Sequence, residues 1–292
     1  MKILLIGHSI IDHFEETGME MSAPGGIFYS TLGMLALEKK KNNITLLTGW
    51  NKKNFYLFED LYSMTDMTPS VRLDEMPEVF LRTSGKGERE EHYLNLASQL
   101  SLNGINDWNL YDGILINMIT GFDISAGQLN QIRKNYSGLI YLDIHSLSRG
   151  VDEQLNRVFR PIPDAEEWLA KIDILQCNEN ELSSVIQYKN ELESASEIIK
   201  RGVKIVIITH GERGVNLYFH NGSAIILHCL DAVKIHAVNK VGCGDIFGAV
   251  FFYSYISTRD PLKSLHKANL AGAVAASAEV LNLKLLANLD DK

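Results

Sequence analysis

The sequence predicts an α/β protein with a mostly parallel central sheet. Six short apolar runs recur along the chain, and each is continuously hydrophobic rather than alternating with polar residues. Helix-length intervals separate them, and this combination is typical of parallel strands that are covered on both faces. The predicted strands are residues 3–6, 44–48, 113–117, 139–144, 172–176 and 204–209.

The intervals between these strands carry the spacing of helices. The segment 26–37 is apolar throughout, whereas 125–135, 179–188 and 191–201 have one apolar face. The dipeptide Asp260-Pro261 predicts the start of a last long helix that extends to Leu281, because aspartate caps a helix and proline suits its first position.

The rhythm changes after Thr209. Three runs, 215–219, 224–229 and 233–238, are separated by only a few residues, and His220-Asn221-Gly222 is a hairpin turn signal. We therefore expect these three strands to form an antiparallel edge, which leads the chain to residue 239.

Two segments do not fit the layered core. Residues 12–24 are polar and acidic, and residues 79–96 contain Gly85-Lys86-Gly87-Glu88, which is typical of a hairpin. Together they predict a small β lid on a single domain that spans residues 1–292. The pattern alone agrees equally well with two surface hairpins that have no role.

Composition excludes several classes of protein. With 46% hydrophobic residues, the 292-residue chain can bury a large core, and its net charge of −8 argues against a nucleic-acid interface. No uncharged apolar stretch approaches the roughly 18 residues of a membrane span. The three cysteines are far apart and form no C-x-x-C pair, so we expect neither a disulfide framework nor a zinc ribbon, and a cytoplasmic location fits best.

The stretch Gly242-Cys243-Gly244-Asp245 is the strongest candidate for a site. Two glycines around one small residue allow a tight turn with exposed amide groups, and the apolar run behind them is long enough to start a helix. Such a turn binds anions. Asp245 cannot itself bind an anion, so we expect it to act as a proton acceptor.

Other polar residues follow the predicted strands, where ligands bind in open α/β sheets. Asp12 and then Gly25-Gly26 follow the first strand. Asn178 and Glu181 have the spacing of a capping box, and their oxygens also suit a hydrated Mg²⁺. Thr209, Gly211 and Gly214 form a turn that can lie against a nucleotide. A P-loop is absent, and no G-x-G-x-x-G follows the first strand, which disfavours a dinucleotide-dependent oxidoreductase.

Taken in order, these elements resemble the ribokinase-like (PfkB) carbohydrate kinase family over nearly the whole chain. The most specific match is Gly242-Cys243-Gly244-Asp245, which is similar to the family's G-[AC]-G-D signature. The resemblance implies a three-layer α/β/α sandwich, a mostly parallel sheet with a small β lid, and transfer of phosphate from ATP to a hydroxyl.

The resemblance also implies roles for individual residues. Asp245 would accept the proton of the alcohol, and the amides of Gly242, Cys243 and Gly244 would stabilise the transferred phosphoryl group. The remaining implied contacts are Asn178 and Glu181 with Mg²⁺ through water, Asn178, Thr209, Gly211, Gly214 and Asn269 with ATP, and Asp12, Gly25, Gly26, Ser30 and Arg82 with the acceptor.

The chain departs from the family pattern in two places. Asn239-Lys240-Val241 stands where many relatives have Asp-Thr-Thr, so the acidic position linked to a monovalent cation is missing and we expect no potassium activation. Lys240 either replaces the charge of that ion or points to solvent. Ile27 and Ser30 stand where sugar kinases often carry asparagines.

The prediction is therefore a cytoplasmic kinase for a small sugar or sugar-like alcohol, with no nucleic-acid or membrane partner. The alternatives are a nucleoside or cyclitol kinase of the same fold, and a catalytically weak ligand-binding regulator. Retention of Asp245 with both glycines favours an enzyme. Family resemblance leaves a homodimer through the lid open, and the sequence does not identify the acceptor.

Overall fold

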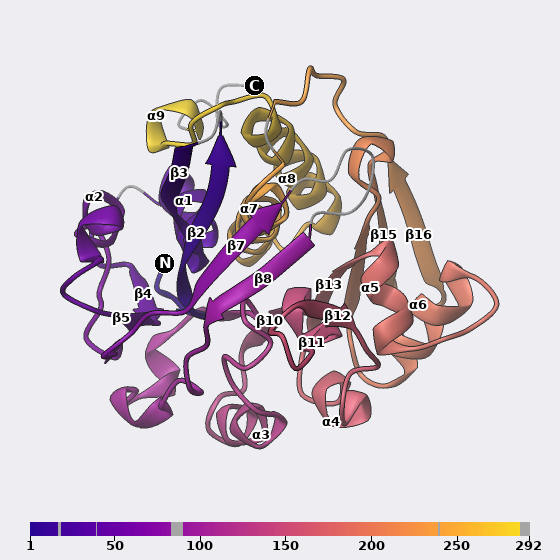
Figure 1. Cartoon of the computed structure of the whole chain (residues 1–292). Coiled ribbons are helices and arrows are strands. Elements are labelled where there is room, and N and C mark those ends of the chain that lie inside the picture. The colour runs from indigo at the N-terminus through magenta and orange to yellow at the C-terminus, as the bar shows by residue number, and fades with distance from the viewer. Residues whose placement is uncertain (17–18, 39, 83–89, 239, 287–292) are drawn as a thin grey trace.

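The computed structural model describes residues 1–16, 19–38, 40–82, 90–238 and 240–286. An eight-stranded sheet forms its centre, in the order β16-β15-β14-β13-β10-β9-β1-β4 (Figure 1). These strands are β1 (Ile3–Ile6), β4 (Ile44–Leu47), β9 (Gly113–Asn117), β10 (Leu139–Asp143), β13 (Ile174–Asn178), β14 (Ile205–Thr209), β15 (Val215–His220) and β16 (Ile225–Leu230).

The strands from β4 to β14 pair in parallel, whereas β15 and β16 are antiparallel to their neighbours. All six strands that the apolar runs predicted are present, and so is the hairpin between β15 and β16. The predicted α/β class with a mostly parallel sheet is confirmed.

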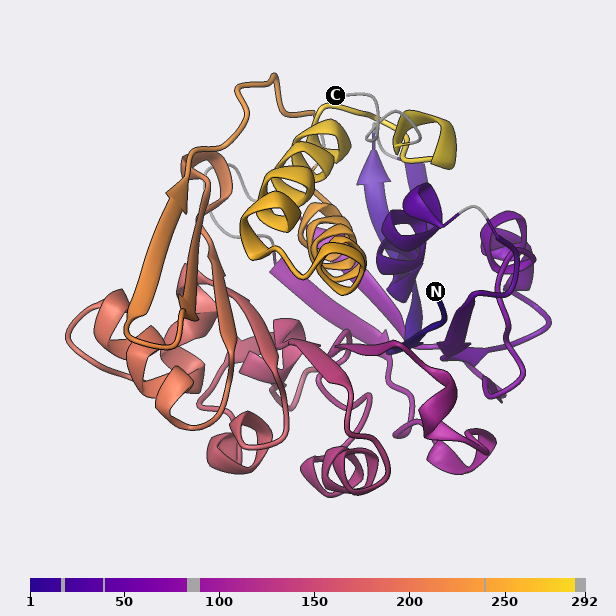
Figure 2. The same cartoon turned by 180° about the vertical axis from the view of Figure 1, so that it is seen from behind.

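Helices cover both faces of the sheet because successive strand residues point to opposite sides. Leu5 packs on one face with α1 (Ile27–Leu37), α7 (Cys243–Thr258), α8 (Pro261–Ala276) and the short α2 (Glu59–Tyr62) and α9 (Leu283–Leu286). Leu4 and Ile6 pack on the other face with α3 (Ala126–Asn135), α4 (Ala165–Leu169), α5 (Glu179–Val185) and α6 (Glu191–Lys200). Figure 2 shows the molecule from behind, and in this view α7 and α8 (orange and yellow) lie between the viewer and the central sheet.

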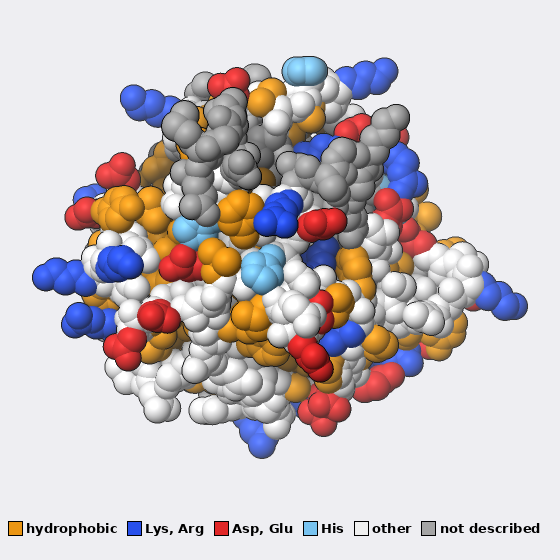
Figure 3. Space-filling view, viewed as in Figure 1, with side chains coloured by type: hydrophobic (Ala, Val, Ile, Leu, Met, Phe, Trp, Pro, Cys, Tyr) orange, Lys and Arg blue, Asp and Glu red, His pale blue; other side chains and the backbone are white. Residues whose placement is uncertain are grey.

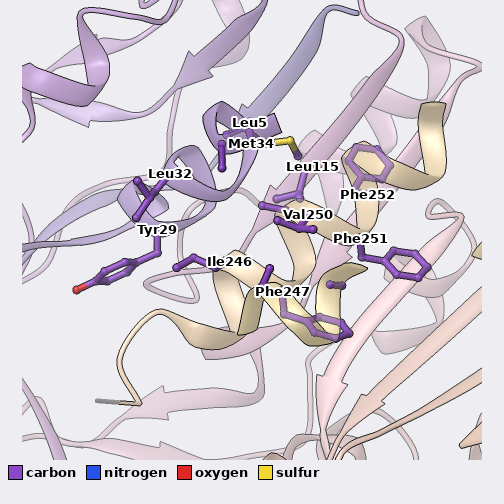
Figure 4. Close-up of a cluster of buried hydrophobic side chains, with 14 of the residues drawn as sticks. Leu5, Tyr29, Leu32, Met34, Leu115, Ile246, Phe247, Val250, Phe251 and Phe252 are labelled. Carbon is purple, nitrogen blue, oxygen red and sulfur yellow. The ribbon is translucent and has the colours of Figure 1, made fainter. Parts of the chain in front are cut away.

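The contact between α1 and α7 is central to the first of these layers. Figure 4 shows side chains of α1, α7 and the sheet packed together, among them Leu32, Leu115 and Val250. Phe251 and Phe252 are fully buried there, and burial of such a side chain stabilises the fold by about 1.5–3 kcal/mol. This packing fixes the position of the N-terminus of α7.

A second, four-stranded sheet lies in front of the carboxyl ends of the central strands (Figure 1). Its order is β3-β2-β7-β8, from β2 (Ser9–Glu16), β3 (Met19–Gly26), β7 (Glu78–Arg82) and β8 (Glu90–Asn95). Ile10, Val79, Leu81, Tyr93 and Ile119 form a small apolar cluster between this sheet and the rest of the chain. We call it the lid sheet; the predicted turn Gly85-Lys86-Gly87-Glu88 lies outside the described residues.

The remaining elements are short. Two further pairs of strands are β5 (Gly49–Trp50) with β6 (Val71–Arg72), and β11 (Arg149–Val151) with β12 (Arg157–Phe159). The 3₁₀ helices in the described part of the chain are η1 (Phe55–Leu57), η2 (Leu102–Gly104), η3 (Trp108–Leu110), η4 (His145–Ser148) and η5 (Gly211–Arg213). Within the described ranges, no helix has the length and hydrophobicity that crossing a membrane requires.

Two predicted elements are corrected. The strand predicted at 233–238 is wrong, because within the described part of the chain this segment forms no strand; Val238 N instead donates to the carbonyl of Ala276, the last residue of α8, at 2.8 Å. The last long helix begins after Asp260 as predicted, but it ends at Ala276 instead of Leu281. There the Ser277 hydroxyl donates to the Val274 carbonyl at 2.9 Å, a side-chain bond that competes with helix continuation.

The face that carries the lid sheet has mixed charge. In Figure 3, basic and acidic side chains alternate with hydrophobic ones over this face, and no large area of one sign is visible.

Candidate active site

The N-terminus of α7 forms the centre of the site. Gly242 caps the helix with φ 75°, and the first helical bond runs from Ile246 N to Gly242 O at 2.9 Å. A Cβ at Gly242 would lie 2.3 Å from the ring of Tyr29, so both the backbone angle and the space require glycine. The first amide groups of a helix have no acceptor within it, so this end of α7 favours an anion.

Asp245 lies in the first turn of α7 and is 8% exposed. Its Oδ1 accepts a hydrogen bond of 2.6 Å from Asn117 Nδ2 at the end of β9. The same amide donates to Ser30 Oγ of α1 at 3.0 Å. Three elements of the fold therefore hold this carboxylate in one orientation.

A cavity of about 50 Å³ brings together residues from opposite ends of the chain. Asp12 and Gly26, two of the residues predicted to contact the acceptor, lie around it with Gly242 and Asp245. The other lining residues come from the lid sheet, α1, the segments after the central strands, the segment before α7 and β12: Ile10, Tyr29, Val79, Leu81, Glu91, Ile119, His145, Arg157 and Val241.

The other predicted acceptor residues lie around this cavity in different ways. Gly25 packs against Asp12, because a Cβ there would lie 2.3 Å from a carboxylate oxygen. Ser30 is buried and does not line the cavity; its hydroxyl accepts a hydrogen bond from Asn117, which also donates to Asp245. Arg82 faces away from it and lies over the ring of Phe80, 5.4 Å from its centroid. Contact of Ser30 or Arg82 with an acceptor stays a prediction.

A buried polar network supports the helix end from below. Gln176 Nε2 donates to Asp143 Oδ2 at 2.8 Å and to the Gly244 carbonyl at 3.1 Å, while Tyr141 donates to Gln176 Oε1. Burial, with the nearby charges of Asp245 and Glu181, raises the pKa of Asp143 well above its ordinary value. Burial also raises the pKa of Cys243 to about 11, so its thiol is protonated at neutral pH.

Asn178 and Glu181 form the predicted capping box at the start of α5. Asn178 Oδ1 accepts from Glu181 N at 2.8 Å, and Glu181 Oε2 accepts from Asn178 N at 2.9 Å. Glu181 Oε1 also lies 3.3 Å from Arg149 Nη1. The structural half of the prediction is confirmed, whereas contact with Mg²⁺ stays a prediction.

The turn after β14 has the conformation that its glycines require. Gly211 and Gly214 have φ of 57° and 104°, and a Cβ at Gly214 would lie 2.1 Å from the Leu230 carbonyl. Thr209 is the last residue of β14 and lies next to Asn178 in the register of the sheet. The turn therefore lies beside α5 at the same sheet edge, and its contact with a nucleotide stays a prediction.

Asn269, predicted to contact ATP, and Lys240, which precedes α7, both interact with other residues of the chain. Asn269 Nδ2 donates to the Asp231 carbonyl at 2.8 Å. Lys240 Nζ lies 3.0 Å from Glu212 Oε1, and both side chains are largely exposed. Lys240 therefore points to solvent, which was one of the two predicted possibilities; Asn239 lies outside the described residues.

Asn117, Asp143, Glu91 and Arg157 are among the site residues that the sequence analysis did not identify. Asn117 and Asp143 end their strands, so the rule that ligands bind at strand ends was a signal for both. Glu91 lies on β8 of the lid sheet, and Arg157 lies on β12 of the β11–β12 hairpin. Neither strand carries a sequence motif, and no sequence pattern predicted that the two side chains form an ion pair.

Comparisons with known proteins agree with this geometry. A model of the pfkB family of carbohydrate kinases matches residues 149–285. The ATP-dependent ribose-1-phosphate kinase of Halopiger xanaduensis is 31% identical over 116 residues, which cover 40% of this chain and 36% of that protein. Deoxyribokinase of Salmonella typhi is 24% identical over 144 residues, 46% of each chain. The matches thus span less than half the length of these relatives.

Solved structures match over nearly the whole chain. A sulfate complex of a pyrophosphate-dependent kinase in the ribokinase family has a TM-score of 0.83 at 18% identity and covers 97% of this chain and 99% of that one. Ribokinase from Thermotoga maritima has a TM-score of 0.77 at 17% identity and covers 100% and 99%. At these identities the likeness establishes the fold.

Proposed function

We propose that this chain is a member of the ribokinase-like (PfkB) carbohydrate kinase family and that it transfers a phosphoryl group from ATP to a hydroxyl of a small sugar or cyclitol. The observation that carries the proposal is the position of Asp245. It lines the cavity together with Asp12 and lies in the first turn of α7, beside the amides that favour an anion. A base next to an anion site is what phosphoryl transfer to an alcohol requires.

In this proposal the chain acts mainly by positioning. Asp12 accepts hydrogen bonds from acceptor hydroxyls, and Asp245 accepts the proton of the reacting hydroxyl. Asn117 keeps Asp245 aimed at that hydroxyl through the 2.6 Å bond. The amides of Gly242, Cys243 and Gly244 stabilise the charge on the transferred phosphoryl group.

The carboxylates of the site suit Mg²⁺. Asp143, Glu181 and Asp245 lie close together, because burial and then the charges of Asp245 and Glu181 raise the pKa of Asp143. Among the described residues, no three acidic, histidine or cysteine side chains converge on one ion position. Mg²⁺ keeps most of its water ligands, so Asp143, Asn178 and Glu181 would hold it through water. The ion would neutralise charge on the donor phosphates.

Pyrophosphate is a second candidate for the donor. The Lys240–Glu212 pair joins the segment before α7 to the turn 211–214, which was predicted to lie against a nucleotide. The amide of Asn269, which was also predicted to contact ATP, already donates to the Asp231 carbonyl. The structurally similar pyrophosphate-dependent kinase shares the fold without a nucleotide donor. ATP remains the first candidate, because the relative from Halopiger is ATP-dependent.

The test is acceptor-dependent product release by the purified protein, with ATP and with pyrophosphate, over ribose, deoxyribose, ribose 1-phosphate, myo-inositol and nucleosides. Asp245→Asn is measured beside it, and we expect kcat to fall by ~10²-fold or more. Asp107→Asn is the matched control, because Asp107 is an exposed cap of η3 and asparagine caps equally well.

The possible results separate the alternatives. Acceptor-stimulated release that needs Asp245 supports the kinase. Donor binding without turnover of any acceptor would instead favour the ligand-binding regulator, and an Asp245→Asn variant as active as the parent would remove the assigned base. A homodimer through the lid sheet and a cytoplasmic location remain predictions, to be checked by light scattering and by fractionation of cells.

A further inference from the structure

A second hollow lies next to the acceptor cavity. It is a groove of about 820 Å³ between the lid sheet and the hairpin formed by β11 and β12. Its lining residues are Phe80, Arg82, Glu90, Glu91, His92, Leu94, Arg149, Asn156, Arg157 and Phe159. Glu91 and Arg157 line both hollows, so these two side chains stand between the small cavity and the large groove.

The Glu91–Arg157 pair is buried and firmly held. The two side chains are 9% and 6% exposed, and Arg157 Nη1 donates to Glu91 Oε2. Arg157 Nη2 donates to the Tyr93 hydroxyl and, at 2.7 Å, to the Ile119 carbonyl. The guanidinium also lies 4.6 Å from the centroid of the Tyr93 ring. A planar group fixed on several sides makes a rigid wall.

Backbone contacts hold the two sides of this wall together. Glu91 and Tyr93 belong to β8 of the lid sheet, whereas Arg157 begins β12. Tyr93 N donates to the Leu155 carbonyl at 2.9 Å, and His92 forms an isolated β-bridge with Asn156. The hairpin therefore keeps β8, and with it Glu91, against the cavity.

The small volume of the cavity makes the Glu91–Arg157 pair a limit on the size of the acceptor. Since one water molecule needs about 10–15 Å³ of such space, 50 Å³ corresponds to roughly four waters and suits one small polyol ring at most. Beyond Glu91 and Arg157, the groove offers further space for a ring substituent. A substituent that an acceptor directs towards Glu91 and Arg157 therefore clashes with the pair while the pair is in place.

We propose that the Glu91–Arg157 pair determines acceptor specificity by limiting the site to compact, unsubstituted polyols. The proposal rests on the proposed function and adds the class of acceptor to it. Ribose and adenosine are a matched pair of probes, because adenosine carries the same 5′-hydroxyl as ribose and adds a base. The protein should bind ribose or myo-inositol and exclude adenosine.

Two double variants separate the size of the wall from its charge. Glu91→Ala with Arg157→Ala removes the wall and joins the cavity to the groove. Glu91→Leu with Arg157→Met keeps its volume without burying an unpaired charge, a replacement that is often neutral or stabilising. Leu94→Ala is the control, since Leu94 is 48% exposed and lines the groove but not the small cavity.

Acceptor binding is measured by calorimetry without donor, so that the result does not depend on turnover. We expect the Ala/Ala variant to gain at least tenfold in the ratio of adenosine to ribose affinity, and the Leu/Met and Leu94→Ala proteins to keep the ratio of the parent. Equal binding of adenosine and ribose by the parent overturns the proposal, and this result needs no variant to fold.

Failure of this inference is distinguishable from failure of the proposed function. A parent that phosphorylates adenosine as well as ribose remains a kinase but has no size limit at this wall. If the parent protein binds neither ribose nor myo-inositol, the proposal that its acceptor is a compact polyol is wrong. An Ala/Ala variant that folds, as judged by a cooperative thermal transition, and still excludes adenosine contradicts the assignment to Glu91 and Arg157.

Discussion

Asn117 Nδ2 lies 2.6 Å from Oδ1 of Asp245, although 128 positions separate the two residues in the sequence. β9 brings one to the sheet edge, and α7 brings the other. The bond links the end of a central strand to the proposed base, so the orientation of that base depends on a residue that does not line the cavity.

Asn117→Ala should lower kcat by about tenfold to a hundredfold, because a hydrogen bond to a charged group contributes about 1.5–3 kcal/mol. KM for the acceptor should change little, since Asn117 does not line the cavity. Steady-state kinetics with the best acceptor check this. Asn135→Ala, at the end of α3, is the control; a normal kcat with a raised KM would contradict the positioning role.

Gly242→Ala should destabilise the fold more than a matched glycine elsewhere. A left-handed backbone costs about 1–2 kcal/mol for a residue with a side chain, and the clash with Tyr29 adds roughly 1–3 kcal/mol of overpacking. Gly202→Ala is the control, because Gly202 has φ 112° and no atom within 4 Å of its Cβ position. The free energies of unfolding in urea should therefore differ between the variants; equal losses would mean that Tyr29 moves away without cost.

Asp143→Asn should change how stability depends on pH. The pKa of Asp143 is raised above its ordinary 3.8 in the folded chain, so the folded state keeps a proton that the unfolded state has lost. The contribution of this group is therefore greatest below pH 3.8, and stability falls as pH rises from there towards the folded pKa.

Urea unfolding from pH 4 to 8 without divalent ions measures this effect. The parent should lose stability with rising pH relative to Asp143→Asn. Asp152 gives a control of opposite sign, because hydrogen bonds from Asn156 lower its pKa and its contribution is lost as pH falls. Parallel curves for the parent and Asp143→Asn would show that Asp143 keeps its ordinary pKa.

The rate should be the same in potassium, sodium and choline salts at equal ionic strength. The acidic position linked to a bound monovalent cation is missing from Asn239-Lys240-Val241, and Lys240 forms an exposed pair with Glu212. Lys240→Ala should leave stability within about 1 kcal/mol, as is usual for exposed pairs. Activation by potassium alone would show that other groups form the cation site.

The sequence predicted the strands and the centre of the site well, because both depend on local patterns. Continuous apolar runs identified every parallel strand of the central sheet, and Gly242 to Asp245 carried a motif whose backbone geometry the structure confirms. The strand at 233–238 failed for a related reason: Val233, Ile235 and Val238 follow a strand-like pattern, but a strand needs a paired neighbour that no local pattern reveals.

The rest of the site depends on pairs that only the fold brings together. Asn117 meets Asp245 across the sheet edge, and Glu91 meets Arg157 between the lid sheet and the hairpin. The sequence around Arg157 is polar and gives no indication that this side chain is buried, because its partners Glu91, Tyr93 and Ile119 come from distant parts of the chain. Resemblance to a family did not supply these residues either, since they lie outside its signature.

The junction between β3 and α1 has a mechanical consequence. β3 of the lid sheet ends at Gly26, and α1 begins at the next residue, so no loop is present to absorb a displacement. Ser30, one turn further along, contacts the amide that holds Asp245. We therefore expect a displacement of the lid sheet to move α1 and, through Ser30 and Asn117, to change the orientation of the Asp245 carboxylate, the proposed base.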